Sequence, residues 1–332
     1  MVSWSPTGQR SRQVVDAEPA YRRIVEAVDA AVGRVPVVLG GSRATGQHTA
    51  ESDYDIVVVL AAFRVPFVIR QLARVAHSLS VQLGVDVTIN PLPASRLKRS
   101  GSNLLLWKLC REGLLLDAPP GFRLPMASEP IDGDRPAISY LLSAALYLIE
   151  ELDLADLRAD TLSPAMQRNV RKALLHVAQV ELYRRGRHAA GLEAALDALG
   201  SHHLRAVAEA SNLPDGWFGV RRELLRELRR RSARSSLGRS VSRNLLYAAL
   251  SALRGQARWW AVAATRSIES GFADAIIALL CAIEPEGKIS ASQLQVAVTA
   301  IPGPLRPSSP TWPQLRGLVA AEWRSAHPLL SL

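Results

Sequence analysis

The chain has 332 residues, a formal net charge of +10 and 48% hydrophobic residues, so it is long enough for two domains that each bury a core. Its two cysteines, Cys110 and Cys281, are far apart in the sequence, which excludes a disulfide framework and is typical of a reducing cytoplasm. The first residues lack the apolar centre of a signal peptide, and the longest apolar run, at 276–283, is too short to span a bilayer. We therefore expect a cytoplasmic protein without membrane segments.

The first informative feature along the chain is a turn of small residues after a short apolar run. Residues 35–39 predict a buried strand, and Gly40, Gly41 and Ser42 follow it directly. Small side chains in a turn allow backbone N–H groups to approach an anion closely. The turn is therefore a candidate cradle for phosphate groups.

A pair of aspartates, Asp53 and Asp55, begins the next apolar strand, which continues over 56–60. Because side chains alternate between the two faces of a strand, both carboxylates point the same way and Tyr54 points the other way. Two carboxylates on one face repel each other unless a cation lies between them. Mg²⁺ binds through one or two carboxylates together with phosphate oxygens. The pair and the turn together predict chemistry on a nucleoside triphosphate.

A third carboxylate, Asp86, follows a helical pattern at 68–83 that Gly84 is expected to end. Residues 85–92 alternate as a strand does, with Asp86 and Thr88 on its polar face. The order strand, helix, strand would bring Asp86 beside the strand of the aspartate pair. An exposed strand residue is the simpler alternative for Asp86 taken alone.

The residues GSRATG at 41–46 and SDYDIVVV at 52–59 resemble the signature of the DNA polymerase β-like nucleotidyltransferase superfamily, and most of all its small bacterial branch. The resemblance extends over residues 20–118, where the helix expected at 103–113 and the short strand after it are similar to the closing elements of the family domain. Thr45 departs from the basic residue that is common at its position.

This resemblance implies a shared mechanism and a set of site residues. Asp53 and Asp55 would hold two Mg²⁺ ions, and Asp86 would complete one metal site and is a candidate to accept the proton of the incoming hydroxyl. Gly41 and Ser42 would bind the β- and γ-phosphates, and Arg43 would help to neutralise them. Two metal ions can stabilise both the attacking and the leaving oxygen of an in-line displacement. The expected reaction transfers a nucleoside monophosphate from an NTP, with ATP as the expected donor, to a hydroxyl acceptor and releases pyrophosphate.

The resemblance implies a nucleotidyltransferase domain with a mixed sheet over 1–118, and with the helical patterns that follow we expect an α+β protein. Prolines and glycines crowd residues 119–136, which is typical of a linker. An all-α domain is expected at 137–300, because the patterns there are helical at 138–157, 169–186, 191–210 and 241–269. A proline-rich tail is expected at 301–332, irregular or extended between 302 and 313.

The acceptor is expected to bind in the helical domain, as is common for this family, and a small-molecule hydroxyl such as that of an antibiotic or natural product is favoured. An acidic cluster after the first helix of that domain could attract a polycationic acceptor, although a solvated helix face is the simpler interpretation. The cluster comprises Glu150, Glu151, Asp153, Asp156 and Asp160.

Other acceptors stay open at this point. Nine arginines lie within 221–243 and permit RNA binding, although Glu223 and Glu227 lie within helical reach and offer ordinary ion pairs. Arg171 and His176 have a spacing similar to the ribonuclease motif of HEPN domains, but five residues along a helix place them on different faces. The alternatives are therefore transfer to tRNA or to a protein partner of toxin–antitoxin type, or a nucleotide-binding module without turnover.

Overall fold

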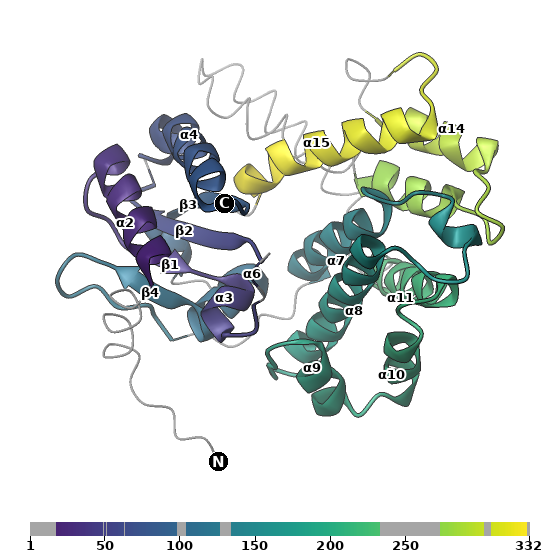
Figure 1. Ribbon diagram of the computed structural model, residues 1–332, viewed down its shortest axis with the longest axis horizontal. Coiled ribbons are helices and arrows are strands. Elements are labelled where there is room, and N and C mark those ends of the chain that lie inside the picture. Colours follow the sequence, from purple (N-terminus) through teal and green to yellow (C-terminus); the bar gives the residue numbers. More distant parts are fainter. Residues whose placement is uncertain are drawn as a thin grey trace. The chain divides into compact units, whose positions relative to one another are not determined.

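The computed structural model describes residues 18–48, 50, 52–62, 64–97, 104–126, 134–232, 273–301 and 307–330, and Figure 1 shows the order of their elements. The chain divides into two compact units, Met1–Ile131 and Asp132–Ser331. The helix expected at 241–269 and the arginines expected after residue 232 lie outside the described residues. None of the helices in the described ranges is both long and apolar enough to cross a membrane.

The first unit contains a four-stranded mixed sheet with the strand order β3-β2-β1-β4. The central strand β1 (Val37–Leu39) pairs antiparallel with β2 (Tyr54–Leu60) and with β4 (Leu114–Asp117). The edge strand β3 (Val87–Pro93) runs parallel to β2. This mixed sheet, with helices in most of the other described residues, confirms the α+β class. The third predicted strand begins two residues later than its pattern suggests, so Asp86 lies directly before β3.

Helices cover both faces of this sheet. On one face, α2 (Pro19–Val32) and α4 (Val65–Leu83) pack against the alternate strand residues that begin with Tyr54 and Val87, in a core that includes Ile24, Val28, Ile56, Val58, Leu72, Leu79 and Ile89. On the other face, α5 (Ala94–Leu97) and α6 (Leu104–Glu112) contribute Leu97, Leu106 and Leu109, which pack with Val38, Val59 and Leu92. Because Asp55 and Val57 alternate with Tyr54 and Ile56, Asp55 belongs to the α5/α6 face.

The connection from α4 to β3 forms as its sequence predicts. Gly84 ends α4 in the left-handed region, with φ +67°, and its N–H donates to the carbonyl of Ser80. The hydroxyl of Ser80 in turn accepts from the N–H of Val87, the first residue of β3, at 2.9 Å. This short connection fixes where β3 begins and therefore where Asp86 lies.

The second unit is helical over its described residues, where strand pairing is limited to one isolated bridge between Ile283 and Ile289. Its centre is formed by the three helices α7 (Asp134–Ile149), α8 (Pro164–Arg184) and α11 (Pro214–Ser232). The indole N–H of the fully buried Trp217 donates to the carbonyl of Leu148 at 3.0 Å. In chain order the elements are α7 (Asp134–Ile149), the short 3₁₀ helix η2 (Asp156–Arg158), α8 (Pro164–Arg184), α9 (Leu192–Leu199), α10 (His202–Glu209), α11 (Pro214–Ser232), a helix over 273–282, α14 (Ala291–Ala300) and α15 (Trp312–Leu330).

One helical pattern, at 191–210, forms two helices instead of a continuous one. Gly200 adopts a left-handed conformation, with φ +63°, and ends α9. Ser201 then caps α10, because its hydroxyl accepts from the N–H of Leu204. A glycine followed by a serine is a stop signal followed by a start signal, and these two residues outweigh the continuous apolar pattern.

The tail expected at 301–332 is also different from the prediction. Residues 307–311 are not helical, but α15 occupies Trp312–Leu330 and buries Trp312, Leu315 and Val319. These three residues recur at helical spacing, and Pro313 lies in the first turn, where its missing N–H costs nothing. The proline content therefore marks the start of a helix and not a continuous irregular tail.

Candidate active site

The glycine turn and the aspartate strand meet at the start of α3 (Gly41–Thr45). The N–H of Gly40 donates to the carbonyl of Asp55 at 2.7 Å, which holds the turn against β2. Gly41 has φ +66°, and a Cβ at this position would lie 2.4 Å from Oδ2 of Asp55. Only glycine fits here, because the backbone conformation and the nearby carboxylate both exclude a side chain. The turn thus leaves backbone directly beside a carboxylate oxygen.

Ser42 lies in the first turn of α3, and its carbonyl organises the residues that follow. This carbonyl accepts from the N–H of Gln47 at 2.9 Å and from the hydroxyl of Thr45 at 3.1 Å. Gly46 ends the helix in the left-handed region, with φ +72°. The departure at Thr45 therefore has a local structural role, since its hydroxyl closes the helical turn.

The carboxylates that the sequence singles out lie at the starts of the two parallel strands. Asp55 pairs with Thr88 across the ladder, and the Thr88 hydroxyl donates to Oδ1 of Asp55 at 3.2 Å. The N–H of Tyr54 donates to the carbonyl of Asp86 at 2.8 Å. Continued by one residue, the same register sets the backbone of Asp86 beside that of Asp53. The strand, helix, strand order therefore brings Asp86 to the strand next to the aspartate pair, as expected.

Asp86 is exposed, and it borders a shallow surface hollow formed with the last turns of α4, including His77 and Ser80. Asp53 and Asp55 are half-buried. Over the described ranges, no three side chains of His, Cys, Asp or Glu gather closely enough to hold a metal ion by themselves. A metal at these strand ends would therefore need oxygen ligands from the substrate.

Sequence reasoning missed the contact of Thr88 with Asp55, although the alternation at 85–92 places Thr88 on the polar face. It also expected Arg43 at the phosphates. The guanidinium of Arg43 instead lies over the ring of Tyr54, 3.8 Å from the ring centroid, and the residue is only 8% exposed. Tyr54 belongs to the face opposite Asp55, and the phosphate contact of Arg43 that the resemblance implies stays a prediction.

The acidic cluster of the helical unit has structural contacts. It follows the end of α7 and is not a helix face. A carboxylate oxygen of Asp153 accepts from the N–H of Ala155 at 2.9 Å, and one of Asp156 accepts from the Ser163 hydroxyl at 3.0 Å. Glu151 accepts from the side-chain amide of Asn169 at 3.1 Å. These bonds hold the connection between α7 and α8.

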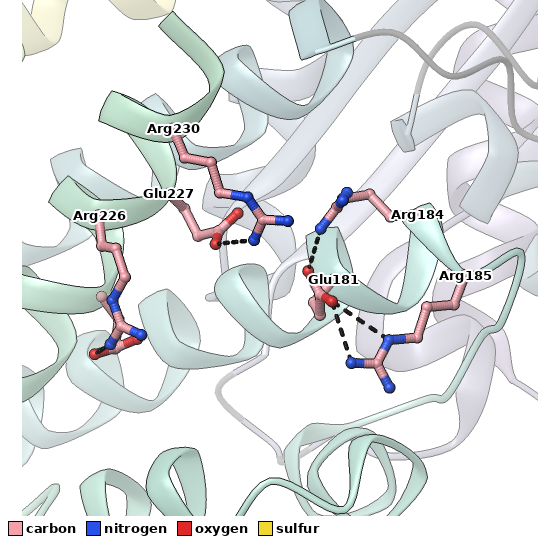
Figure 2. Close-up of polar contacts among 7 residues, drawn as sticks. Glu181, Arg184, Arg185, Arg226, Glu227 and Arg230 are labelled. Carbon is pink, nitrogen blue, oxygen red and sulfur yellow. Dashed lines mark hydrogen bonds and ion pairs between the residues drawn. The ribbon is translucent and has the colours of Figure 1, made fainter. Parts of the chain in front are cut away.

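Two arginines of α11 also have local partners. Arg226 is paired with Glu223, and Arg230 with Glu227 at 3.2 Å, each one turn away along the helix. Figure 2 shows the second pair, together with Glu181 of α8 and its partners Arg184 and Arg185. Ordinary ion pairs thus account for Arg226 and Arg230, two of the nine arginines that could have indicated RNA binding.

The Arg171 and His176 pair is divided between different neighbours. Arg171 is paired with Glu193 of α9 at 2.8 Å. The imidazole of His176 stacks on Tyr140 of α7, with ring centroids 3.9 Å apart. The two side chains therefore do not form a common site, and both have a structural role.

The class of the N-terminal unit is given by a comparison with known families. Residues 21–104 match the family model described as the nucleotidyltransferase domain. This match within the N-terminal unit is consistent with the polymerase β-like superfamily and supports a general nucleoside monophosphate transfer activity. Searches of curated proteins and of solved structures return no match.

Proposed function

We propose that this protein transfers a nucleoside monophosphate from an NTP, with ATP as the expected donor, to a hydroxyl group of a small molecule. The observation that carries the proposal is the contact between the glycine turn and Asp55. A Cβ on Gly41 would lie 2.4 Å from Oδ2 of Asp55. The backbone of Gly41 and this carboxylate can lie so close only because Gly41 has no side chain. A triphosphate that spans this junction would contact N–H groups on one side and metal-bound carboxylates on the other.

The donor set suits Mg²⁺, because Asp53, Asp55 and Asp86 offer hard carboxylate oxygens and the phosphates would supply further ligands. Asp53 and Asp55 would hold the ions, and Asp86 would complete one of the sites. When bound, Mg²⁺ would stabilise the charge of the attacking and leaving oxygens. The Thr88 hydroxyl, 3.2 Å from Oδ1 of Asp55, would keep that carboxylate in a fixed orientation.

The proposed step is an in-line displacement at the α-phosphorus. The acceptor oxygen forms a bond to the α-phosphorus while the bond from that phosphorus to the bridging oxygen of the β-phosphate breaks. Pyrophosphate leaves with the bridging oxygen. The hydroxyl proton of the acceptor passes to a carboxylate, for which Asp86 is the candidate. The protein contributes mainly position and charge stabilisation.

The experiment is a fractionation of labelled product. The purified protein is incubated with Mg²⁺, each α-³²P-labelled NTP in turn and an extract that contains small molecules, RNA and protein. We expect acid-soluble label that is distinct from the nucleotide itself. Label in precipitated RNA or protein would contradict the proposed acceptor and leave nucleotidyl transfer in place, and a failure to consume any NTP would contradict the reaction itself.

A further inference from the structure

Arg43 is bound to the loop that leads into the aspartate strand. Its Nε donates to the carbonyl of Ser52 at 2.9 Å, and its Nη2 donates to the carbonyl of Ala50 at 3.3 Å. These carbonyls come just before Asp53. A single guanidinium therefore holds the last residues of the loop in two places, and the planar geometry of its donors suits such a double contact.

The far side of the guanidinium is covered by a second set of contacts. Its Cζ lies 3.8 Å from the centroid of the Tyr54 ring, and Nη1 lies 3.9 Å from Oε1 of Glu18. The Tyr54 hydroxyl donates to the same Glu18 oxygen at 3.4 Å. The cation is thus enclosed by loop, ring and carboxylate.

The position of Tyr54 between the two aspartates decides which face of β2 Arg43 occupies. Side chains alternate along a strand, so the Tyr54 ring lies on the face opposite the carboxylates of Asp53 and Asp55. Arg43 belongs to α3, the helix that begins at Gly41 beside Asp55. The Arg43 side chain therefore links α3, beside which the phosphates are proposed to bind, to the backbone that carries the proposed metal ligands Asp53 and Asp55.

We propose that Arg43 is a positioning residue, which fixes the backbone before Asp53 relative to α3 and does not contact the triphosphate. This inference rests on the proposed function for its kinetic consequence. Loss of the Arg43 contacts with the carbonyls of Ala50 and Ser52, which we call the clamp, releases the loop end. The Asp53 and Asp55 carboxylates then lose their fixed placement relative to the glycine turn. Such misplacement lowers the rate of the chemical step more than the affinity for the nucleotide.

Two substitutions distinguish this role from a direct phosphate contact. Arg43→Lys keeps the positive charge but cannot reproduce the double contact with stacking on Tyr54, and Arg43→Gln removes the charge as well. We expect both variants to lower kcat by roughly 10- to 100-fold, the range typical of lost orienting contacts, with less than about a threefold change in KM for the NTP. A normal kcat with a KM that rises about tenfold or more in Arg43→Gln, and full activity in Arg43→Lys, would overturn the proposal.

A second measurement is independent of activity. Amide hydrogen exchange of the free protein should be faster over residues 47–54 in both Arg43 variants, with little change in the helices of the second unit. Unchanged exchange in that segment would overturn the clamp. If the wild-type protein transfers no nucleotide at all, the proposed function fails, whereas the exchange result still decides the role of Arg43.

Matched variants complete the test. Arg34→Lys alters another arginine of the same unit, which pairs with Asp117 at 3.1 Å on the surface, and should leave kcat and exchange over 47–54 unchanged. Glu18→Gln weakens the anchor of Arg43 without touching the loop carbonyls. It should shift kcat and exchange in the same direction as the Arg43 variants, by a smaller factor. A fall in kcat in Arg34→Lys as large as that in Arg43→Lys would overturn the assignment.

Discussion

The carboxylates of the two units have opposite surroundings. In the helical unit, Glu181, Glu223 and Glu227 each form an ion pair with arginine. Their side chains are 24%, 6% and 13% exposed, respectively. In the N-terminal unit, the backbones of Asp53 and Asp86 lie at the starts of neighbouring strands, and Asp55 lies beside a glycine turn and accepts from Thr88.

Under the proposed function, the carboxylates of the helical unit serve stability, and Asp53, Asp55 and Asp86 would serve chemistry. A buried carboxylate paired with arginine contributes to folding, because removing it leaves its partners without their acceptor. Carboxylates that come together around a metal ion cost stability when the ion is absent, and the proposed Mg²⁺ site would require this of Asp53, Asp55 and Asp86. Substitution of the aspartates in the first unit should therefore lower activity more than stability. Substitution of the paired glutamates in the helical unit should lower stability more than activity.

The largest expected effect is that of Asp55→Asn on activity. The variant should lose more than about a hundredfold in the rate of pyrophosphate release, which exceeds the loss typical of residues that only orient a metal ligand. Its thermal stability should be unchanged or slightly higher, because one of the neighbouring negative charges is removed. Asp117→Asn, on the surface end of β4, is the control and should remain active. An active Asp55→Asn enzyme would break the comparison.

Gly41→Ala should have the next largest effect. The added Cβ would lie 2.4 Å from Oδ2 of Asp55, and φ +66° is unfavourable for alanine. We expect loss of most transfer activity and a decrease of about 1–3 kcal/mol in the free energy of unfolding. Gly200→Ala is the matched control, since Gly200 has φ +63° and open space around it. Steady-state kinetics and urea unfolding of both variants should show a decrease in stability for both and a decrease in activity only for Gly41→Ala.

Glu223→Gln should show the reverse pattern. Glu223 accepts from Arg226 and lies 2.7 Å from Nε2 of His203, and its side chain is almost fully buried. Loss of the charge should lower the free energy of unfolding by about 1–3 kcal/mol, while kcat stays unchanged. Urea unfolding monitored by circular dichroism measures this change, and the exposed Glu209→Gln is the control. Unaltered stability would mean that the buried pair contributes nothing.

The smallest effect concerns pH. Burial alone would raise the pKa of Glu181, but hydrogen bonds from Arg184 and Arg185 lower it below its ordinary value of 4.5. Because the pKa is lower in the folded state, the stabilisation is present above the ordinary value and is lost as the pH falls through the folded-state value. Urea unfolding in steps between about pH 6 and pH 3 should show a shallower acid-induced loss of stability in Glu181→Gln than in the wild type. Identical slopes would contradict the assignment.

Much of the first unit could be predicted from its sequence. The alternation at 85–92 and the apolar runs that flank Asp53 and Asp55 specify strands, and Gly84 specifies the end of α4, because these signals are local. In the second unit, the split at Gly200 and Ser201 was not predicted, although these two residues are local stop and start signals. The helix α15 was not expected, since the prolines before it outweighed the apolar spacing of Trp312, Leu315 and Val319.

The placement of Arg43 could not be predicted from the sequence. Its position in the motif indicated a phosphate ligand, but its partners Glu18 and Tyr54 come from α2's N-terminal boundary and from β2. A side chain with a long flexible stem can reach either face of the strand, and only the tertiary arrangement decides between them. The partners of Arg226 and Arg230 were predictable, because Glu223 and Glu227 lie one turn away along the same helix.

The most direct test of the central claim uses two labels on the same nucleotide. Parallel reactions with α-³²P- and γ-³²P-labelled NTP, Mg²⁺ and the acceptor fraction separate nucleotidyl transfer from phosphoryl transfer. The account predicts α-label on the acceptor and γ-label in pyrophosphate in equal amounts, with both signals lost in Asp53→Asn. Transfer of the γ-label to the acceptor, or equal activity in Asp53→Asn, would contradict it.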